Sequence, residues 1–264
     1  QYNLLFGPET STANRCCIAG MVGNNSCGLH SLVYGSTREH LLEANVILSD
    51  GNQVVLKQYS EEEFQNKANQ NDLEGKIYRY IQNTFSSEQL KQEIKENFPE
   101  KEVSRRNNGY ALDFLIDSPN PNLAKLYAGS EGTLGFATEF KLNLVSLPPK
   151  HKAVICVHFS ELKDSFTGNL IALRHSPMAV ELMDNNIIEA AYRNPTQKQN
   201  TFFIEDEPKA ILIIEFAEES EEKLQAKLQE TISDFKENSS AYAFPIIYNE
   251  KISRVWELRK AGLG

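Results

Sequence analysis

Residues 16–36 read CCIAGMVGNNSCGLHSLVYGS, and this stretch carries no Asp, Glu, Lys or Arg. Its four glycines permit positive φ angles and let the backbone approach a ligand closely. Asn24 and Asn25 add amide donors and acceptors without adding charge. An uncharged, glycine-rich wall with a few polar groups is typical of a site for a large flat cofactor. Composition alone is equally compatible with a tightly packed buried turn.

The same stretch holds three cysteines, which raises a metal site and a catalytic thiol as alternatives. Zinc sites usually take ligand pairs two to four residues apart, whereas Cys16 and Cys17 are adjacent. Only Cys27 and His30 have a plausible spacing, and no pattern ties a cysteine to a base. Cysteine is often a small buried hydrophobic residue. We therefore predict no metal site, and a zinc module on Cys27 and His30 stays a minor alternative.

A second glycine cluster, AGSEGTLGF at residues 128–136, favours the cofactor interpretation. It lacks the Gly-Lys-Ser/Thr ending of a phosphate-binding P-loop, so its glycine spacing alone is weak evidence. Its consecutive backbone N–H groups are nevertheless suited to an anion-binding nest. A third polar turn, NNGY at 107–110, directly follows Arg105 and Arg106.

The whole chain has 264 residues, a formal net charge of −9, 41% hydrophobic residues and 24% charged residues. This balance is ordinary for a globular protein and argues against binding nucleic acid through a broad basic surface. No apolar run approaches the roughly 18 residues that indicate a membrane span. Four cysteines without an export signal indicate reduced thiols in the cytoplasm, with peripheral attachment to the inner membrane as a variant. Because the chain starts at Gln1 and stops just after a helix-like run, we expect a fragment of a longer protein.

Periodicity predicts an α+β fold in two parts that divide at Pro148-Pro149. In the first part, residues 46–56 are expected to form a hairpin, and the polar residues 59–102 two or three inserted helices. In the second part, apolar strands at 153–159 and 210–216 each precede a helix with one apolar face. These faces consist of Leu162, Phe166, Leu170 and Leu173 in one helix, and Leu224, Leu228, Ile232 and Phe235 in the other.

The glycine clusters and their flanking segments, taken in order, resemble FAD-linked oxidases and dehydrogenases. The segments are FGPETSTANRCCIAGMVGNNSCGLHSLVYGSTREHLLEANVILSDG, RRNNGYALDFL, GSEGTLGFATEFKLNLVSLPP, AVELMDNNIIEAA and VWELRKAGLG. The superfamily is that of vanillyl-alcohol oxidase and p-cresol methylhydroxylase (PCMH). The most similar branch contains D-lactate dehydrogenases, the glycolate oxidase FAD subunit and D-2-hydroxyglutarate dehydrogenases. The resemblance covers nearly the whole chain apart from residues 59–102.

The resemblance implies the fold and the cofactor. Residues 1–148 correspond to the second half of a PCMH-type FAD-binding domain, with a helical insert at about 59–102. Residues 149–264 correspond to the first part of the C-terminal domain of FAD-linked oxidases, a ferredoxin-like α+β substrate (cap) domain. FAD is the implied cofactor. The polar insert and the sequence RRNNGYALD are similar to those of large bacterial members of the family. These members carry an iron–sulfur domain elsewhere in the full-length protein.

The resemblance also implies which residues contact FAD. They are Pro8, Cys17, Gly20, Asn24, Gly28 and Ser31 in the first segment, and Glu131, Gly132 and Phe136 in the second. Two positions depart from the family pattern, because Cys17 stands where Thr is usual and Ala19 where Gly is usual. A thiol is a weaker hydrogen-bond partner than a hydroxyl, and Ala19 brings a methyl group towards the cofactor.

The implied activity is oxidation of a small D-2-hydroxyacid of the D-lactate, glycolate or 2-hydroxyglutarate type, by hydride transfer to the flavin. Arg259 of the W-x-x-R pattern would bind the substrate carboxylate, since a guanidinium suits bidentate carboxylate recognition. A surface arginine beside Trp256 is the alternative interpretation. The identity of the hydroxyacid, the electron acceptor and the oligomeric state stay open.

Two family segments have no counterpart within the 264 residues: a glycine-rich loop that grips the FAD pyrophosphate, and a His-rich catalytic motif. We therefore predict that the chain alone is inactive and binds FAD weakly or not at all. A non-catalytic accessory subunit or scaffold of the same fold is the alternative function.

Overall fold

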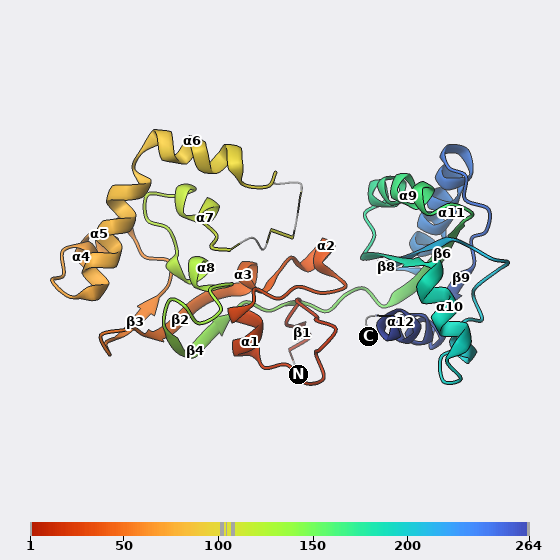
Figure 1. Ribbon diagram of the computed structural model, residues 1–264, viewed down its shortest axis with the longest axis horizontal. Helices are drawn as coiled ribbons and strands as arrows, with labels where there is room; N and C mark the ends of the chain where they lie inside the picture. Colours follow the sequence, from red (N-terminus) through yellow and green to blue (C-terminus); the bar gives the residue numbers. More distant parts are fainter. Residues whose placement is uncertain (1, 101–102, 104, 107–108, 263–264) are drawn as a thin grey trace. The chain divides into compact units, whose positions relative to one another are not determined.

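The computed structural model describes residues 2–100, 103, 105–106 and 109–262. The chain divides into two compact units, Gln1–Ser146 and Leu147–Gly264. Both units mix helices with strands, so the predicted α+β class is confirmed (Figure 1). Within the described ranges, no helix combines the length and the apolar character needed to cross a bilayer.

The first unit is built on a three-stranded antiparallel sheet in the order β3-β2-β4. The predicted hairpin is confirmed by β2 (Leu41–Ile47) and β3 (Gln53–Leu56), and β4 (Phe136–Leu142) pairs with the other edge of β2. The hairpin turns where Asp50 Oδ1 accepts the Asn52 N–H at 3.0 Å. The smaller elements are β1 (Leu4–Leu5), α1 (Ile18–Gly23), α2 (Ser31–Tyr34), α3 (Thr37–His40), α7 (Asp113–Ile116), α8 (Leu123–Tyr127) and β5 (Val145–Ser146).

The polar insert folds into three helices, as its periodicity predicts. They are α4 (Glu61–Ala68), α5 (Leu73–Phe85) and α6 (Glu88–Asn97). Each begins at a capping side chain, because Ser60, Asp72 and Ser87 accept a backbone N–H from the first turn that follows. The isolated apolar residues of the insert pack with Leu115 of α7 and Leu123 of α8 in a small core, in which Phe64 and Tyr78 are buried edge to face.

The second unit has a four-stranded antiparallel sheet in the order β7-β8-β6-β9. Its elements are β6 (His151–Phe159), α9 (Leu162–Arg174), β7 (Ala179–Asp184), α10 (Asn185–Arg193), η1 (Lys198–Asn200), β8 (Ala210–Glu218), α11 (Glu221–Asn238), β9 (Ile246–Tyr248) and α12 (Lys251–Ala261). The βαββαβ order β6-α9-β7-β8-α11-β9, with this strand arrangement, is that of a ferredoxin-like fold. Helices α9 and α11 cover one face, and α10 and α12 lie on the other (Figure 1).

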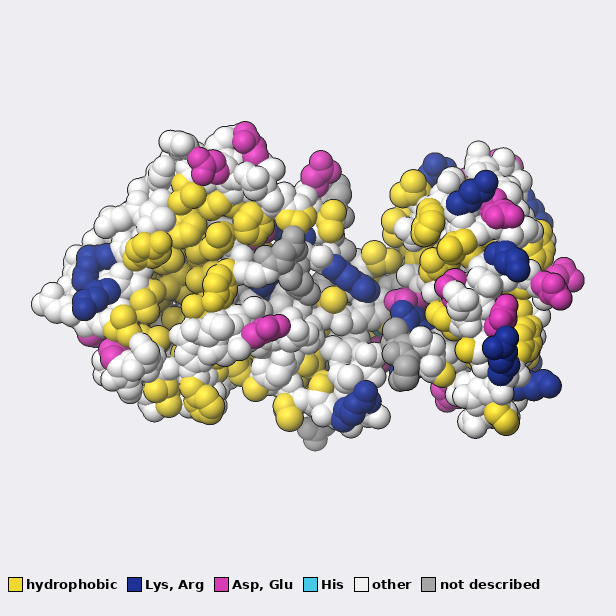
Figure 2. Space-filling model, viewed as in Figure 1, with side chains coloured by type: hydrophobic (Ala, Val, Ile, Leu, Met, Phe, Trp, Pro, Cys, Tyr) yellow, Lys and Arg dark blue, Asp and Glu magenta, His cyan; other side chains and the backbone are white. Residues whose placement is uncertain are grey.

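The two predicted apolar helix faces have different outcomes. In α11 the stripe packs on the sheet, since Leu224, Leu228 and Phe235 are fully buried. In α9 the stripe is exposed: Phe166 is 59% and Leu170 62% accessible, and hydrophobic side chains show at the surface around α9 in Figure 2. The buried face of α9 is its small-residue side, Ser165, Gly168, Ile171 and Ala172.

The reason is the close approach of α9 to the sheet. A Cβ added at Gly168 would lie 2.5 Å from Cζ of the buried Phe159 ring, so only glycine fits there. The strand side chain fills the space that a large helix side chain would occupy, and the larger residues of α9 therefore point away from the sheet.

Candidate functional site

The two glycine clusters, a hundred residues apart in sequence, are joined by backbone hydrogen bonds. The Gly129 N–H donates to the Val22 carbonyl at 2.9 Å, and the Glu131 N–H donates to the Gly23 carbonyl at 3.0 Å. Gly129 takes φ +87° and Glu131 φ +51°. A left-handed conformation at a glutamate is strained, and such strain is typical of functional loops.

Asn25 fixes the turn that follows α1. Its side chain is 1% exposed, and its Oδ1 accepts hydrogen bonds from Ser36 Oγ at 2.9 Å and from the Arg38 N–H at 2.8 Å. Asn25 also takes φ +47°, which asparagine tolerates better than most residues. The adjacent Asn24 is exposed instead. The asparagine pair thus divides into one supporting residue and one accessible residue.

Arg38 is a functional candidate that the sequence analysis missed. Its guanidinium is buried and donates to the carbonyls of Lys125 at 3.0 Å and Ala128 at 2.7 Å. Burial lowers the pKa of Arg38 from its ordinary value, and the guanidinium makes no ion pair in the described part of the chain. No sequence signal distinguishes this arginine, because it stands among polar residues in front of a strand.

The third polar turn connects to both glycine clusters. Arg105 donates through Nε to Ser31 Oγ at 2.7 Å and through Nη2 to the Gly28 carbonyl at 3.0 Å. Tyr110 OH lies 2.6 Å from Thr133 Oγ1 in the second cluster. Residues 107–108 of this turn lie outside the described residues. All three clusters read from the sequence therefore converge in the first unit.

The three clusters border a half-open hollow of about 290 Å³. Its lining consists of Asn24, Asn25, Arg38, Gly109, Tyr110, Gly129, Ser130, Glu131 and Thr133. Ser130 is 3% exposed, and its Oγ has no hydrogen-bond partner among the described residues. A buried hydroxyl without a partner is costly, so Ser130 Oγ is a candidate contact for a group bound in the hollow.

The implied cofactor residues fall into three groups. Asn24 and Glu131 line the hollow, while Cys17 directly before α1 and Gly20 within it are exposed. Gly28 has a packing role as well, because a Cβ there would lie only 1.3 Å from the Glu9 carbonyl oxygen.

The remaining implied residues lie around this region. Ser31 is buried and supports Arg105, and Pro8 is buried in the preceding segment. Gly132 is exposed with φ +81°, and Phe136 is 71% exposed at the start of β4. Direct contact of all these residues with a cofactor stays a prediction.

The zinc alternative finds no support in the structure. His30 Nδ1 lies 3.2 Å from the Glu9 carboxylate. No three His, Cys, Asp or Glu side chains come together as a metal-ligand group within the described ranges. All four cysteines are free thiols, and burial raises the pKa of Cys156.

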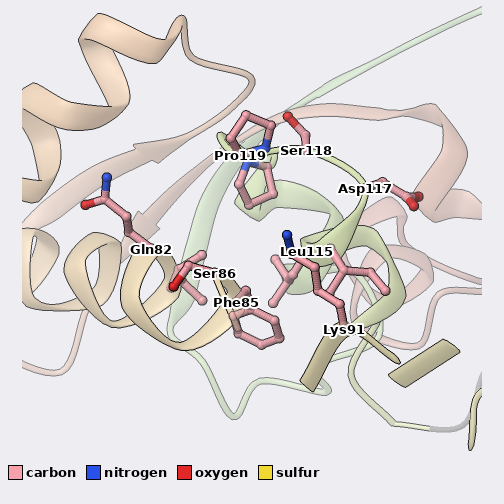
Figure 3. Close-up of a pocket in the computed structure, with 11 residues that line it drawn as sticks. Gln82, Phe85, Ser86, Lys91, Leu115, Asp117, Ser118 and Pro119 are labelled. Carbon is pink, nitrogen blue, oxygen red and sulfur yellow. The ribbon is translucent and has the colours of Figure 1, made fainter. Parts of the chain in front are cut away.

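A further hollow of about 310 Å³ lies beside the helical insert (Figure 3). Apolar side chains such as Phe85, Leu115 and Pro119 line it, together with Lys91. Lys91 Nζ is paired with the exposed Glu88 at 2.6 Å. The hollow has no strained residue and no buried unpartnered group, so we assign no chemistry to it.

Arg259 lies in the second unit, in the last turn of α12. Its Nε donates to Glu181 Oε2 at 2.8 Å, and its Nη2 donates to the same oxygen. Glu181 belongs to β7, and the side chains of both residues are mostly buried, at 15% and 22% exposure. The Arg259 guanidinium is therefore fixed by its hydrogen bonds to Glu181 and is not a free surface side chain.

Comparison with known proteins assigns both units. Residues 1–57 match the family described as FAD binding domain, and residues 148–264 match FAD linked oxidases, C-terminal domain. A D-2-hydroxyglutarate dehydrogenase of Pseudomonas putida is 26% identical over 271 residues, covering 100% of this chain and 26% of the relative. The glycolate oxidase subunit GlcD of Escherichia coli is 27% identical over 191 residues, covering 72% of this chain and 27% of the relative.

A solved structure of alkyldihydroxyacetonephosphate synthase shares the fold with a TM-score of 0.55 at 13% identity, covering 96% of this chain and 38% of that one. The chain thus places a glycine-rich first unit, which matches the FAD binding domain, before a ferredoxin-like second unit, which matches the C-terminal domain of FAD linked oxidases. The chain is similar to FAD-linked oxidases in both units, and the curated relatives named above are a D-2-hydroxyglutarate dehydrogenase and a glycolate oxidase subunit. It spans about a quarter of the length of the curated relatives named above.

Three observations indicate that the residues of the first unit fit FAD. The Ser130 hydroxyl is buried without a partner. Apart from its chain neighbours and its own helix backbone, no described atom lies within 4 Å of a Cβ added at Gly20 or Gly23, so this side of α1 is open to a flat group. The buried Arg38 guanidinium provides positive potential next to the hollow, which favours an anionic cofactor.

Proposed function

We propose that the protein to which this chain belongs is an FAD-dependent dehydrogenase or oxidase of small D-2-hydroxyacids. Residues 1–148 are its cofactor-binding part and residues 149–264 its substrate-binding part. The observation that carries the proposal is the convergence of both glycine clusters on the unpartnered Ser130 hydroxyl beside buried Arg38. The names of the relatives, which are 2-hydroxyacid enzymes, support the substrate class.

In this proposal the chemistry that bound FAD would supply is a hydride acceptor for the α-hydrogen of the substrate. The residues of this chain bind and orient. Ser130 Oγ and the Asn24 amide offer hydrogen bonds to the cofactor, and Arg38 favours its negative charge without leaving its carbonyl partners.

On the substrate side, Arg259 binds the carboxylate of the hydroxyacid, which leaves the hydroxyl-bearing carbon as the reacting centre. The base that takes the hydroxyl proton is not assigned to a described residue. The candidate electron acceptor is an iron–sulfur module in the longer protein.

The test is expression of the full-length protein, followed by measurement of bound FAD and of dye reduction with D-lactate, glycolate and D-2-hydroxyglutarate. We expect stoichiometric FAD and turnover of at least one of the three, with the L-enantiomers of the chiral substrates inactive. FAD binding without turnover of any hydroxyacid would favour the accessory subunit. Absence of both FAD and turnover would refute the proposal.

A further inference from the structure

Helix α12 is attached to the sheet of the second unit by two carboxylates. Trp256 Nε1 donates to Glu215 Oε2 at 2.9 Å, and Arg259, about one turn later, donates to Glu181. Glu215 on β8 stands opposite Ala179 on β7, so Glu215 and Glu181 point to the same face of the sheet. Two attachment points one turn apart determine both the position and the rotation of α12 on the sheet.

The contact with Glu181 occupies only one side of the Arg259 guanidinium. Nε and Nη2 both donate to the single oxygen Oε2 of Glu181. Nη1 donates to no group in the described part of the chain. A guanidinium carries five N–H groups, so the edge between Nη1 and Nη2 keeps donors available. Such an edge binds a carboxylate through two parallel hydrogen bonds.

We propose that Glu181 is a positioning residue for recognition of the substrate carboxylate. It holds Arg259 from the Nε side and leaves the Nη1–Nη2 edge for the carboxylate of the hydroxyacid. The negative charge of Glu181 also directs an incoming carboxylate to the opposite edge, because like charges repel. This inference rests on the proposed function, in which Arg259 binds the substrate.

The structure explains why a glutamate is required at this position. The two residues are 78 positions apart and come from different elements, a strand and a helix end. An arginine side chain has many rotamers, and an unheld guanidinium loses conformational entropy when it binds a carboxylate. Glu181 removes that loss before the substrate arrives, which is the meaning of preorganisation.

The experiment uses the full-length, FAD-loaded protein with three substitutions of Glu181. Glu181→Ala releases the guanidinium, and we expect the KM for the hydroxyacid to rise about tenfold or more, with kcat much less affected. Glu181→Asp withdraws the carboxylate by one methylene and moves KM in the same direction by less. Glu181→Gln keeps an acceptor oxygen for the Nε–H but removes the negative charge, so its KM rises by less than that of Glu181→Ala.

A second readout does not need turnover. Binding of oxalate, followed through the absorbance of the bound flavin, weakens in Glu181→Ala by the same factor as KM rises. The FAD content stays unchanged in all variants. As a matched control, Glu189→Ala removes an exposed carboxylate that pairs with Arg193 at 3.2 Å in the same unit, and it alters neither KM nor oxalate affinity.

A double substitution separates positioning from structural support. Once Arg259→Met has removed the guanidinium, adding Glu181→Ala changes KM no further, because Glu181 acts through Arg259. Unchanged KM and oxalate affinity in Glu181→Ala and Glu181→Asp overturn the role of Glu181 and leave the proposed function intact. A wild-type protein that neither oxidises a hydroxyacid nor binds oxalate overturns both.

Discussion

The substitution Ser130→Ala distinguishes a ligand contact from a structural role of this serine. The two roles predict opposite signs for the change in the free energy of unfolding of the cofactor-free protein. The hydroxyl is 3% exposed and has no hydrogen-bond partner in the described part of the chain, so it is desolvated without compensation in the cofactor-free protein. A buried polar group left unsatisfied costs roughly 1–3 kcal/mol. Ser130→Ala removes this cost and leaves a space of one oxygen atom. We expect the cofactor-free protein to become more stable by about 1 kcal/mol.

The same substitution should weaken FAD binding. If Ser130 Oγ bonds the cofactor, its loss removes one neutral hydrogen bond, worth roughly 1 kcal/mol. That free energy corresponds to about a fivefold higher Kd. The assay is thermal unfolding of the FAD-stripped full-length protein, combined with titration of FAD by quenching of its fluorescence.

A buried serine in the second unit provides the control for this prediction. Ser165 is 1% exposed, and its Oγ donates to the Leu162 carbonyl at 2.6 Å. Ser165→Ala therefore removes a satisfied hydrogen bond, and we expect a loss of stability with unchanged FAD affinity. Lower stability of Ser130→Ala together with an unchanged FAD Kd would show that Ser130 is a structural serine like Ser165.

Three further predictions concern packing and pH. Gly28→Ala brings a Cβ against the Glu9 carbonyl and should cost roughly 1–3 kcal/mol, read from the unfolding midpoint; an unshifted midpoint contradicts the close approach. Gly168→Ala should lower the free energy of unfolding by a similar amount. Leu170→Ser, on the exposed apolar face of α9, should change it by no more than about 0.5 kcal/mol. A larger loss for Leu170→Ser than for Gly168→Ala would show that this face belongs to the core. The His175 hydrogen bond lowers the pKa of Asp234 from its ordinary value of 3.8, so its stabilisation is present above that value and is lost as pH falls through the lower folded-state pKa. Asp234→Asn should therefore lose less stability than the wild type over this acid range in pH-dependent melting, and identical acid profiles would contradict the assignment.

The chain sequence by itself determined the local structure and the class. The turn residues of the hairpin and the capping residues Ser60, Asp72 and Ser87 act on neighbours within a few positions, so their effect is readable from order alone. The glycine clusters indicated a cofactor wall because their backbone chemistry does not depend on what packs behind them.

Only the tertiary structure decided which face of a helix is buried and which polar groups meet. The stripes of α9 and α11 look alike in sequence, yet Gly168 brings α9 so close to Phe159 that its small-residue side faces the sheet. The burial of Arg38 and the contact of Arg259 with Glu181 depend on partners 78 to 90 positions away. Periodicity reports the hydrophobicity of a helix face but not the shape of the surface opposite it. The interior is close-packed, so that shape decides the outcome.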